Sequence, residues 1–242
     1  MYNEMQCNTI IKRHSEDISF GLYINFKPVM ENNINKIMIA ASTVKLFILY
    51  YLLKNGYNKK IIKNSEIIKT PDSILNFLNS DINIEFLIVL MISESDNTSA
   101  NFFIDLIGIN NLNNFIKKEG FIDTIFERKF LDYNAIKLGY NNYTSVRDLK
   151  LLINKIFTSD LKYKFLSFFY MQKDRSKLSL YINDDVNIGG KSGELYNVYN
   201  DIIYYNINNQ DIINIVLTNN LPFIISRELL PSIGYNFYKK LL

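Results

Sequence analysis

Apolar residues are spaced in two different ways along this chain, and the change of spacing constrains the fold more than any other feature. Near the N-terminus and after residue 185, apolar and polar residues alternate or form short apolar runs, which is typical of β-strands. These segments are FGLYINF at 20–26 and then VNIGGKSGEL, NDIIYYNI and DIINIVLTNN between 186 and 220. Asn-rich turns separate the last three, which predicts successive antiparallel strands.

The middle of the chain has the spacing of buried and amphipathic helices. A short apolar segment at 36–42 is either a strand or the approach to a helix, and the expected helices follow at 42–55, 82–95, 98–108, 110–120 and 145–157. The chain closes with another helix pattern at 225–242. We therefore expect a single α+β domain over 1–242. One lobe holds the sheet (about 1–60 and 186–242) and the other is helical (about 61–185).

Composition excludes several classes of site. The chain has 242 residues and a net charge of +3, with its Lys residues scattered, so the sequence does not favour nucleic-acid binding. It has one cysteine, Cys7, and one histidine, His14. An intramolecular disulfide and a Cys/His zinc site are therefore impossible, and a Ser-His-Asp enzyme is disfavoured. We expect no metal and no cofactor.

The longest apolar runs are LFILYYLL and FLIVLMI, which are too short to span a bilayer. The first residues also lack the apolar core of a secretion signal. These features predict a cytoplasmic protein with no membrane contact, or a secreted one if a leader has been removed. The oligomeric state does not follow from the sequence.

Two polar residues interrupt the apolar stretch MIAASTVKLFILYYLL at 38–53. Ser42 and Lys45 are three positions apart, so they share one face of a helix. A serine at a helix N-terminus lies where developing negative charge is favoured. A desolvated lysine has a lowered pKa and can act as a base. The pair is therefore a candidate nucleophile with its activator, although the S-x-x-K pattern alone is common.

Two further motifs argue against a chance occurrence of this pattern. Ser95, Asp96 and Asn97 follow the apolar helix pattern, and Lys191-Ser192-Gly193 lies on an expected strand. The three motifs, in this order, match the set found in class A β-lactamases and penicillin-binding proteins. The chain resembles this serine-hydrolase family over nearly its whole length. The resemblance implies an antiparallel five-stranded sheet flanked by helices, an all-helical lobe, and a site in the cleft between them.

The resemblance also implies catalytic roles for four residues. Ser42 would attack the lactam or amide carbonyl, and Lys45 would help to deprotonate it. Ser95 would relay a proton to the leaving nitrogen. Lys191 would hold Ser95 and the substrate carboxylate electrostatically.

Substrate binding would involve the remaining motif positions. Asn97 would bind the side-chain amide of a small-molecule substrate, and Ser192, beside Gly193, would bind its carboxylate. The backbone N–H groups of Ser42 and Glu194 would form an oxyanion hole. Many relatives have an arginine on the strand after the Lys-Thr-Gly motif; Arg227 is a possible substitute, with a surface helix position as the equally plausible alternative.

One loop departs from the class A pattern. Relatives carry R-x-E-x-x-L-N, in which Glu activates the water that releases the acyl group. Aligning Arg128 without a gap puts Phe130 at the Glu position and Asn134 at the Asn position. A phenylalanine cannot accept a proton, so acylation would outrun release. A shifted register would instead make Asp132 the base.

We therefore interpret the chain as a serine hydrolase that hydrolyses, or is acylated by, β-lactams through Ser42. Three alternatives stay open from the sequence. The same motifs could serve a peptidase, esterase or amidase with another substrate. The chain could also be a β-lactam-binding sensor without turnover, or a scaffold without chemistry.

Overall fold

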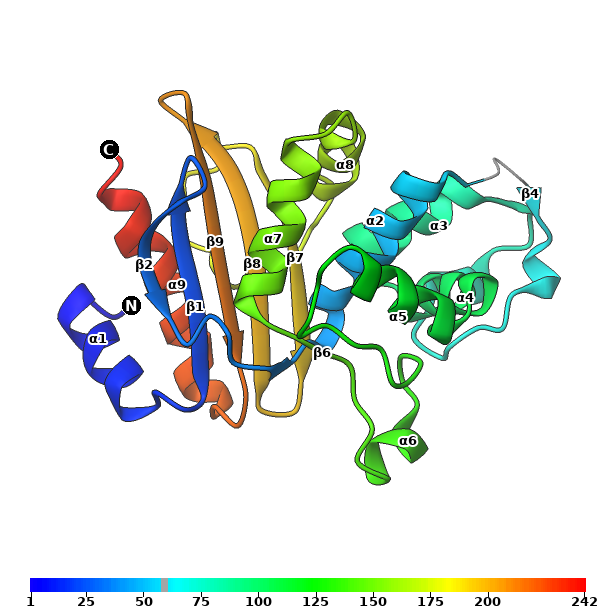
Figure 1. Ribbon diagram of the computed structural model, residues 1–242, viewed down its shortest axis with the longest axis horizontal. Coiled ribbons are helices and arrows are strands. Elements are labelled where there is room, and N and C mark those ends of the chain that lie inside the picture. Colours follow the sequence, from blue (N-terminus) through cyan, green and yellow to red (C-terminus); the bar gives the residue numbers. More distant parts are fainter. Residues whose placement is uncertain (58–60) are drawn as a thin grey trace.

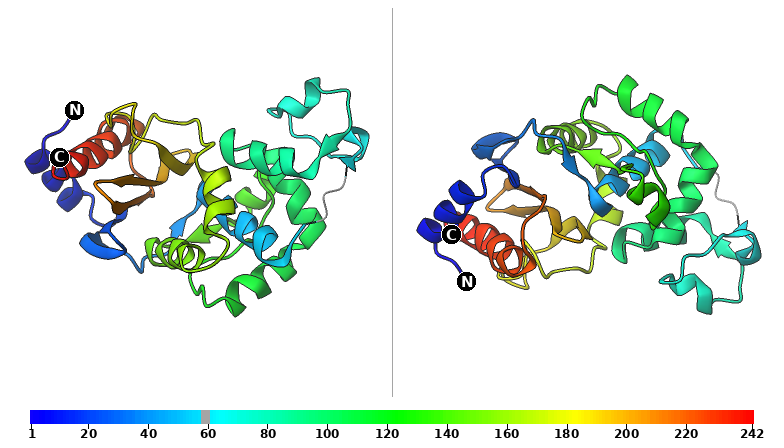
Figure 2. Two further views of the ribbon diagram at one scale, coloured as in Figure 1. Left: turned by 90° about the horizontal axis from the view of Figure 1, so that it is seen from above. Right: turned by 90° about the horizontal axis from the view of Figure 1, so that it is seen from below.

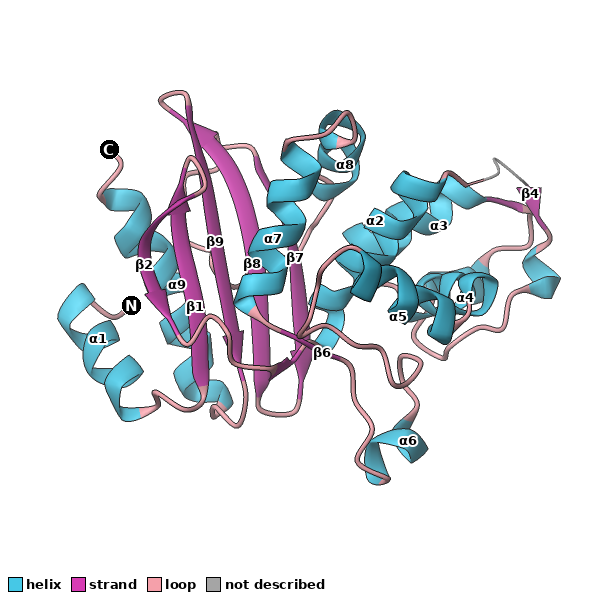
Figure 3. Ribbon diagram, in the orientation of Figure 1, coloured by secondary structure: helices cyan, strands magenta, loops and turns pink. Residues whose placement is uncertain are grey.

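The computed structural model of this protein describes residues 1–57 and 61–242. Figures 1 and 3 show a β-sheet with helices on both faces, and beside it a mostly helical part. The sheet is antiparallel throughout, in the order β2-β1-β9-β8-β7. Its strands are β1 (Ile18–Ile24), β2 (Lys27–Asn32), β7 (Ile188–Leu195), β8 (Val198–Ile207) and β9 (Gln210–Thr218). The expected α+β fold, with both ends of the chain in one five-stranded sheet, is confirmed.

The N-terminal strands differ in detail from the expectation. FGLYINF is not one strand, because Asn25 and Phe26 adopt positive φ and turn the chain into β2. The segment at 36–42 does not pair with any strand of the main sheet. Only Met38–Ile39 (β3) is a strand, and it pairs with Tyr143–Thr144 (β6). β2 was not expected, because it is an exposed edge strand without alternating apolar residues.

Among the described residues, a helix lies in every predicted helical segment, and three further helices, at 4–13, 133–137 and 162–169, were not predicted. The helices are α1 (Glu4–Arg13), α2 (Lys45–Asn55), α3 (Ile84–Ser93), α4 (Asn97–Ile107), α5 (Ile109–Lys118), α6 (Tyr133–Lys137), α7 (Val146–Phe157), α8 (Lys162–Phe169) and α9 (Phe223–Lys239). A second strand pair joins β4 (Ile61–Ile62) to β5 (Ile82–Asn83). Within residues 1–57 and 61–242, no helix is both long and apolar enough to cross a membrane. The boundary between lobes that we expected near residue 60 falls outside the described residues.

Apolar side chains from the two faces of the sheet enter two separate cores. Helices α1 and α9 cover one face, as Figure 2 shows, where Leu229 and Phe237 pack with Phe20 and Val216. The opposite face shares a core with α7 and with the helical part. Edge strand β7 also lies against a short 3-10 turn, Ala41–Val44 (η1), at the start of α2. That contact brings two of the three sequence motifs together.

Candidate active site

Ser42 lies in η1, immediately before α2, and lines an open cleft. The preceding residue, Ala41, has a φ of 46°, in the left-handed region that residues other than glycine rarely adopt. Asn200 on β8 holds this turn, because its side-chain amide donates to the carbonyls of Ile39 at 2.8 Å and Ala40 at 3.1 Å. The sheet therefore fixes the backbone from which Ser42 projects.

Lys45 begins α2 and is fully buried. Its Nζ donates to the backbone carbonyl of Ser95, to Ser95 Oγ at 3.3 Å and to Asn97 Oδ1 at 2.8 Å. Burial holds the pKa of Lys45 well below its usual value, and the charge of Lys191 lowers it further. The hydrogen bonds join the first and second motifs, while burial and the charge of Lys191 favour a neutral amine that can accept a proton.

The Ser-Asp-Asn motif forms the turn between α3 and α4. Ser95 has a φ of 56°, and Asp96 caps α4 by accepting from the backbone N–H of Ser99 at 2.6 Å. Asn97, the first residue of α4, donates from Nδ2 to Asp72 Oδ2 at 2.9 Å. Asn97 is thus held from both sides, by Lys45 and by Asp72.

Lys191 and Gly193 lie on the edge strand β7. Lys191 is fully buried, and its Nζ donates to the carbonyl of Ser192 at 2.9 Å. Burial lowers the pKa of Lys191 to about 7. Gly193 lies against η1 so closely that an added Cβ would be 2.7 Å from the backbone nitrogen of Ser42. A glycine here lets the third motif approach the first.

The cleft between these elements has a volume of about 380 Å³. Lys45 and Lys191 are buried beside it rather than lining it. Its lining includes most of the expected site residues together with several that the sequence did not indicate: Ser42, Asp72, Ser93, Glu94, Ser95, Asn97, Gln172, Lys173, Asp174, Lys177, Ser192, Gly193 and Glu194.

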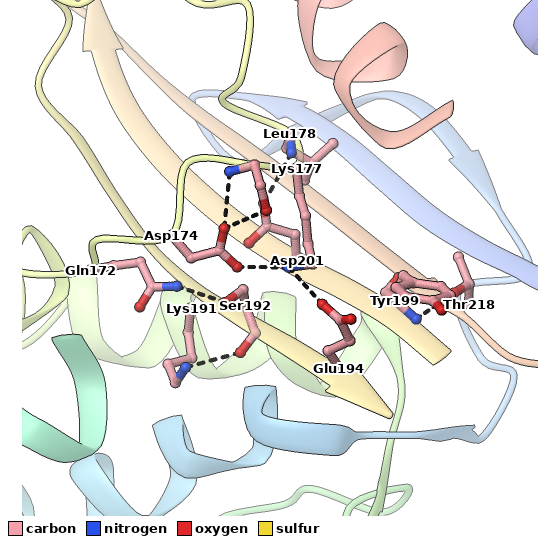
Figure 4. A network of polar contacts seen from close by, with 11 residues as sticks. Gln172, Asp174, Lys177, Leu178, Lys191, Ser192, Glu194, Tyr199, Asp201 and Thr218 are labelled. Carbon is pink, nitrogen blue, oxygen red and sulfur yellow. Dashed lines mark hydrogen bonds and ion pairs between the residues drawn. The ribbon is translucent and has the colours of Figure 1, made fainter. Parts of the chain in front are cut away.

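A charged network lies along the β7 side of the cleft (Figure 4). Lys177 contacts Asp174 at 2.6 Å and the half-exposed Glu194 at 3.4 Å. Asp201 on β8, paired with Ser192 across the strands, is buried and accepts from the N–H of Leu178 at 3.1 Å. Burial raises the pKa of Asp201 to about 7.

Gln172 joins this side of the cleft to the helical part. One end of its buried amide lies 2.7 Å from the carbonyl oxygen of Ile92, near the end of α3. The other end lies 3.0 Å from the backbone nitrogen of Ser192 and 2.8 Å from its Oγ. The sequence did not indicate Gln172, because a single glutamine outside a motif has no spacing that marks it.

Phe130 lies directly beside the buried lysine. Its ring centroid is 4.4 Å from Lys45 Nζ, and its side chain is almost fully buried. Asn101 on α4 fixes the loop at this point by accepting from the N–H of Phe130 at 2.8 Å and donating to its carbonyl at 3.0 Å. Within residues 1–57 and 61–242, Lys45 makes no ion pair with a carboxylate.

The structure does not bring three other candidates into the cleft lining. Asp132 is exposed and caps α6 by accepting from the N–H of Ala135 at 2.9 Å. Asn134 is exposed on α6, and Arg227 is exposed near the start of α9. Among the described residues, no three His, Cys, Asp or Glu side chains are placed to hold a metal ion.

Comparison with known proteins gives one family. A family profile described as the beta-lactamase enzyme family matches residues 4–239. No curated protein sequence matches the chain significantly. Among solved structures, a β-lactamase from Sphaerobacter thermophilus DSM 20745 is 19% identical, with a TM-score of 0.81, and the match covers 99% of this chain and 98% of that one.

Two other solved structures have the same fold. A class A β-lactamase from Mycobacterium abscessus is 15% identical, with a TM-score of 0.83 and 98% of both chains covered. PBP-A is 20% identical, with a TM-score of 0.76 and 98% of both chains covered. The profile match over nearly the whole chain shows that this protein belongs to the beta-lactamase enzyme family.

Proposed function

We propose that Ser42 forms an acyl-enzyme with β-lactams or related amides and esters, and that this acyl group is released slowly. Family and fold support a serine β-lactamase-like hydrolase. The observation that carries the finer proposal is the ring of Phe130, 4.4 Å from Lys45 Nζ, where the class A loop would supply a general base. The acylating groups are present, and the group expected to activate water is replaced by an aromatic ring.

Acylation would begin with proton transfer from Ser42 Oγ to a neutral Lys45. The Oγ–C bond then forms at the carbonyl of the substrate. Collapse of the tetrahedral intermediate breaks the C–N bond, and the leaving nitrogen takes a proton through Ser95, whose Oγ lies 3.3 Å from Lys45 Nζ. The lysine ends the step neutral, so the proton lost by Ser42 leaves on the amine.

The oxyanion would be stabilised by the backbone N–H groups of Ser42 and Glu194. The close approach of Gly193 to the nitrogen of Ser42 supports this pairing, because it brings β7 and η1 together at the nucleophile. Removing one such donor typically costs about 3–4 kcal/mol of barrier.

Release needs a base that removes a proton from water, and general-base assistance contributes about 10²–10⁴-fold. An aromatic ring provides none. In the solved structures, a mutant of PBP-A with glutamate in place of a leucine occurs as an acyl-enzyme complex with penicillin G. It is 21% identical to this chain, with a TM-score of 0.75. This neighbour supports penicillin as a first probe.

The proposal is tested by labelling with a fluorescent penicillin and, separately, with an uncharged fluorophosphonate. Both should label the wild type and neither should label Ser42→Ala, whose folding is verified by its thermal unfolding curve. Undiminished labelling of folded Ser42→Ala would refute Ser42 as the nucleophile. Labelling by the fluorophosphonate alone would favour the peptidase, esterase or amidase alternative.

A further inference from the structure

The orientation of the Gln172 amide follows from its backbone neighbours. The carbonyl of Ile92 can only accept a hydrogen bond, so the amide nitrogen must face it at 2.7 Å. The N–H of Ser192 can only donate, so the amide oxygen must lie at the other end, 3.0 Å away. Figure 4 draws the amide the other way round, with its nitrogen toward Ser192, which would set the amide oxygen against the carbonyl of Ile92 and the amide nitrogen against the N–H of Ser192.

This orientation decides what Ser192 offers to a ligand. The amide oxygen of Gln172 also lies 2.8 Å from Ser192 Oγ, and two oxygens at this distance require a hydrogen between them. The carbonyl-type oxygen has none, so the hydroxyl of Ser192 must donate its only proton to Gln172. Only the lone pairs of Oγ are then available to a ligand in the cleft. Ser192 can then accept a hydrogen bond from a substrate but cannot give one to a carboxylate.

The charges around Ser192 favour the same kind of ligand. Two carboxylates, Asp174 and Glu194, line this side of the cleft. Lys177 lies between them, is nearly buried and contacts both carboxylates. Its single positive charge is therefore smaller than their combined negative charge. Lys191 is fully buried, and its Nζ donates to a backbone carbonyl. The lowered pKa of Lys191, about 7, reduces its average charge near neutral pH.

We propose that the subsite beside Ser192, set by Gln172, selects acyl donors that present a neutral or cationic N–H donor there instead of a carboxylate. This inference rests on the proposed function, because it names the substrate class of the same Ser42 site. An anion in this subsite would face lone pairs and two carboxylates. An amide or ammonium group would find acceptors.

Three penicillins that differ in one group test this selectivity. They are penicillin G, its carboxamide and its aminoethyl amide, which present a carboxylate, a neutral N–H donor and an ammonium group. Second-order rate constants for acylation of Ser42 are measured by intact-protein mass spectrometry. We expect the carboxamide and the aminoethyl amide to react at least about tenfold faster than penicillin G, the effect of one mismatched polar contact.

Two variants separate the contributions of the residues. Gln172→Met has a similar length and accepts only weakly, so it should free the Ser192 proton and reduce the preference against the carboxylate. Glu194→Gln removes a charge without changing shape, so it should slow the aminoethyl amide relative to the neutral carboxamide. A wild-type protein that reacts fastest with penicillin G, or a preference unchanged in Gln172→Met, would overturn the proposal.

Binding to Ser42→Ala tests the subsite without chemistry. Calorimetric titration with the same three compounds should give the weakest binding for penicillin G. Equal affinities, or binding by none of the three, would contradict the inference. If Ser42→Ala shows the expected order but the wild type is acylated by none, then the proposed acylation fails while the subsite assignment stands.

Discussion

Replacing Phe130 with glutamate would put a carboxylate next to Lys45, where the structure has an aromatic ring. The new glutamate supplies a general base. We propose that the lack of this base makes release of the acyl group slow. We expect Phe130→Glu to release a bound penicilloyl group faster than the wild type, because the carboxylate can remove a proton from an attacking water.

The magnitude follows from the position of the ring, whose centroid is 4.4 Å from Lys45 Nζ. At that separation, a charge pair at an effective dielectric constant of about 20 attracts by about 4 kcal/mol. The attraction acts only while Lys45 is protonated, and burial both lowers the pKa of Lys45 and raises that of the glutamate, so only part of the glutamate acts as a base near neutral pH. We therefore expect about a 10²-fold faster release, at the low end of general-base assistance.

The Phe130→Glu substitution should also lower the stability of the folded protein. Phe130 is only 8% exposed, and losing the burial of one such side chain costs about 1.5–3 kcal/mol. Phe130→Gln shares this cost and the shape of glutamate but offers no base, so it is the matched control. Release is measured by pulse labelling with penicillin, removal of the excess, and intact-protein mass spectrometry over time.

Equal release rates in Phe130→Glu and Phe130→Gln would refute the reasoning. The alternative register is tested with Asp132→Asn. Because Asp132 is exposed and caps α6, and asparagine caps a helix as well as aspartate, we expect this variant to keep its stability and to release the acyl group at the wild-type rate. Stalled turnover in Asp132→Asn would instead assign the base to Asp132.

Two further predictions concern acylation. The pKa of Lys45 is lowered by burial and by Lys191, and only the neutral amine can accept the proton of Ser42. The acylation rate should therefore rise with pH through an apparent pKa well below about 10.4, that of a free lysine, and a flat profile at saturating substrate would point to another base. In Gly193→Ala, the new Cβ would lie 2.7 Å from the nitrogen of Ser42, so β7 must move away from η1. We expect acylation to fall by at least about tenfold, for an overpacking strain of about 1–3 kcal/mol, and an unchanged rate in the folded variant would contradict the close contact.

Much of the fold was predictable because its elements have strong periodic patterns. Strands β7, β8 and β9 alternate or run apolar between Asn-rich turns, α3 is a long apolar run, and α7 has apolar residues at helical spacing. β2 and α1 lack such patterns. β2 is an exposed edge strand, and α1 buries only Cys7 among its ten residues. Elements with little buried apolar surface leave little trace in the sequence.

The motif residues were predictable because their spacing is fixed by local structure. The structure brings Lys45, Ser95 and Asn97 into hydrogen-bonding contact. The residues that support them were not predictable. Asn200 and Gln172 act through contacts with segments distant in sequence, and single amides in an Asn-rich chain carry no local signal.

The position of Phe130 illustrates both cases. An ungapped alignment of the loop predicts that it occupies the position of the class A glutamate, and its ring lies beside Lys45. The same alignment put Asn134 near the water site, but this residue is exposed on α6 and outside the cleft lining. The short helix carries the chain away from the site after Asp132, which a residue-by-residue alignment cannot foresee.

Slow release of the acyl group from Ser42 is the central claim, and a pulse-chase measurement tests it most directly. The protein is acylated with penicillin G, freed of excess antibiotic, and followed by intact-protein mass spectrometry, with the modified peptide mapped by digestion. The account predicts one penicilloyl group on Ser42 that persists long after the excess is removed. An adduct on another residue, or one that disappears as fast as it forms, would contradict it.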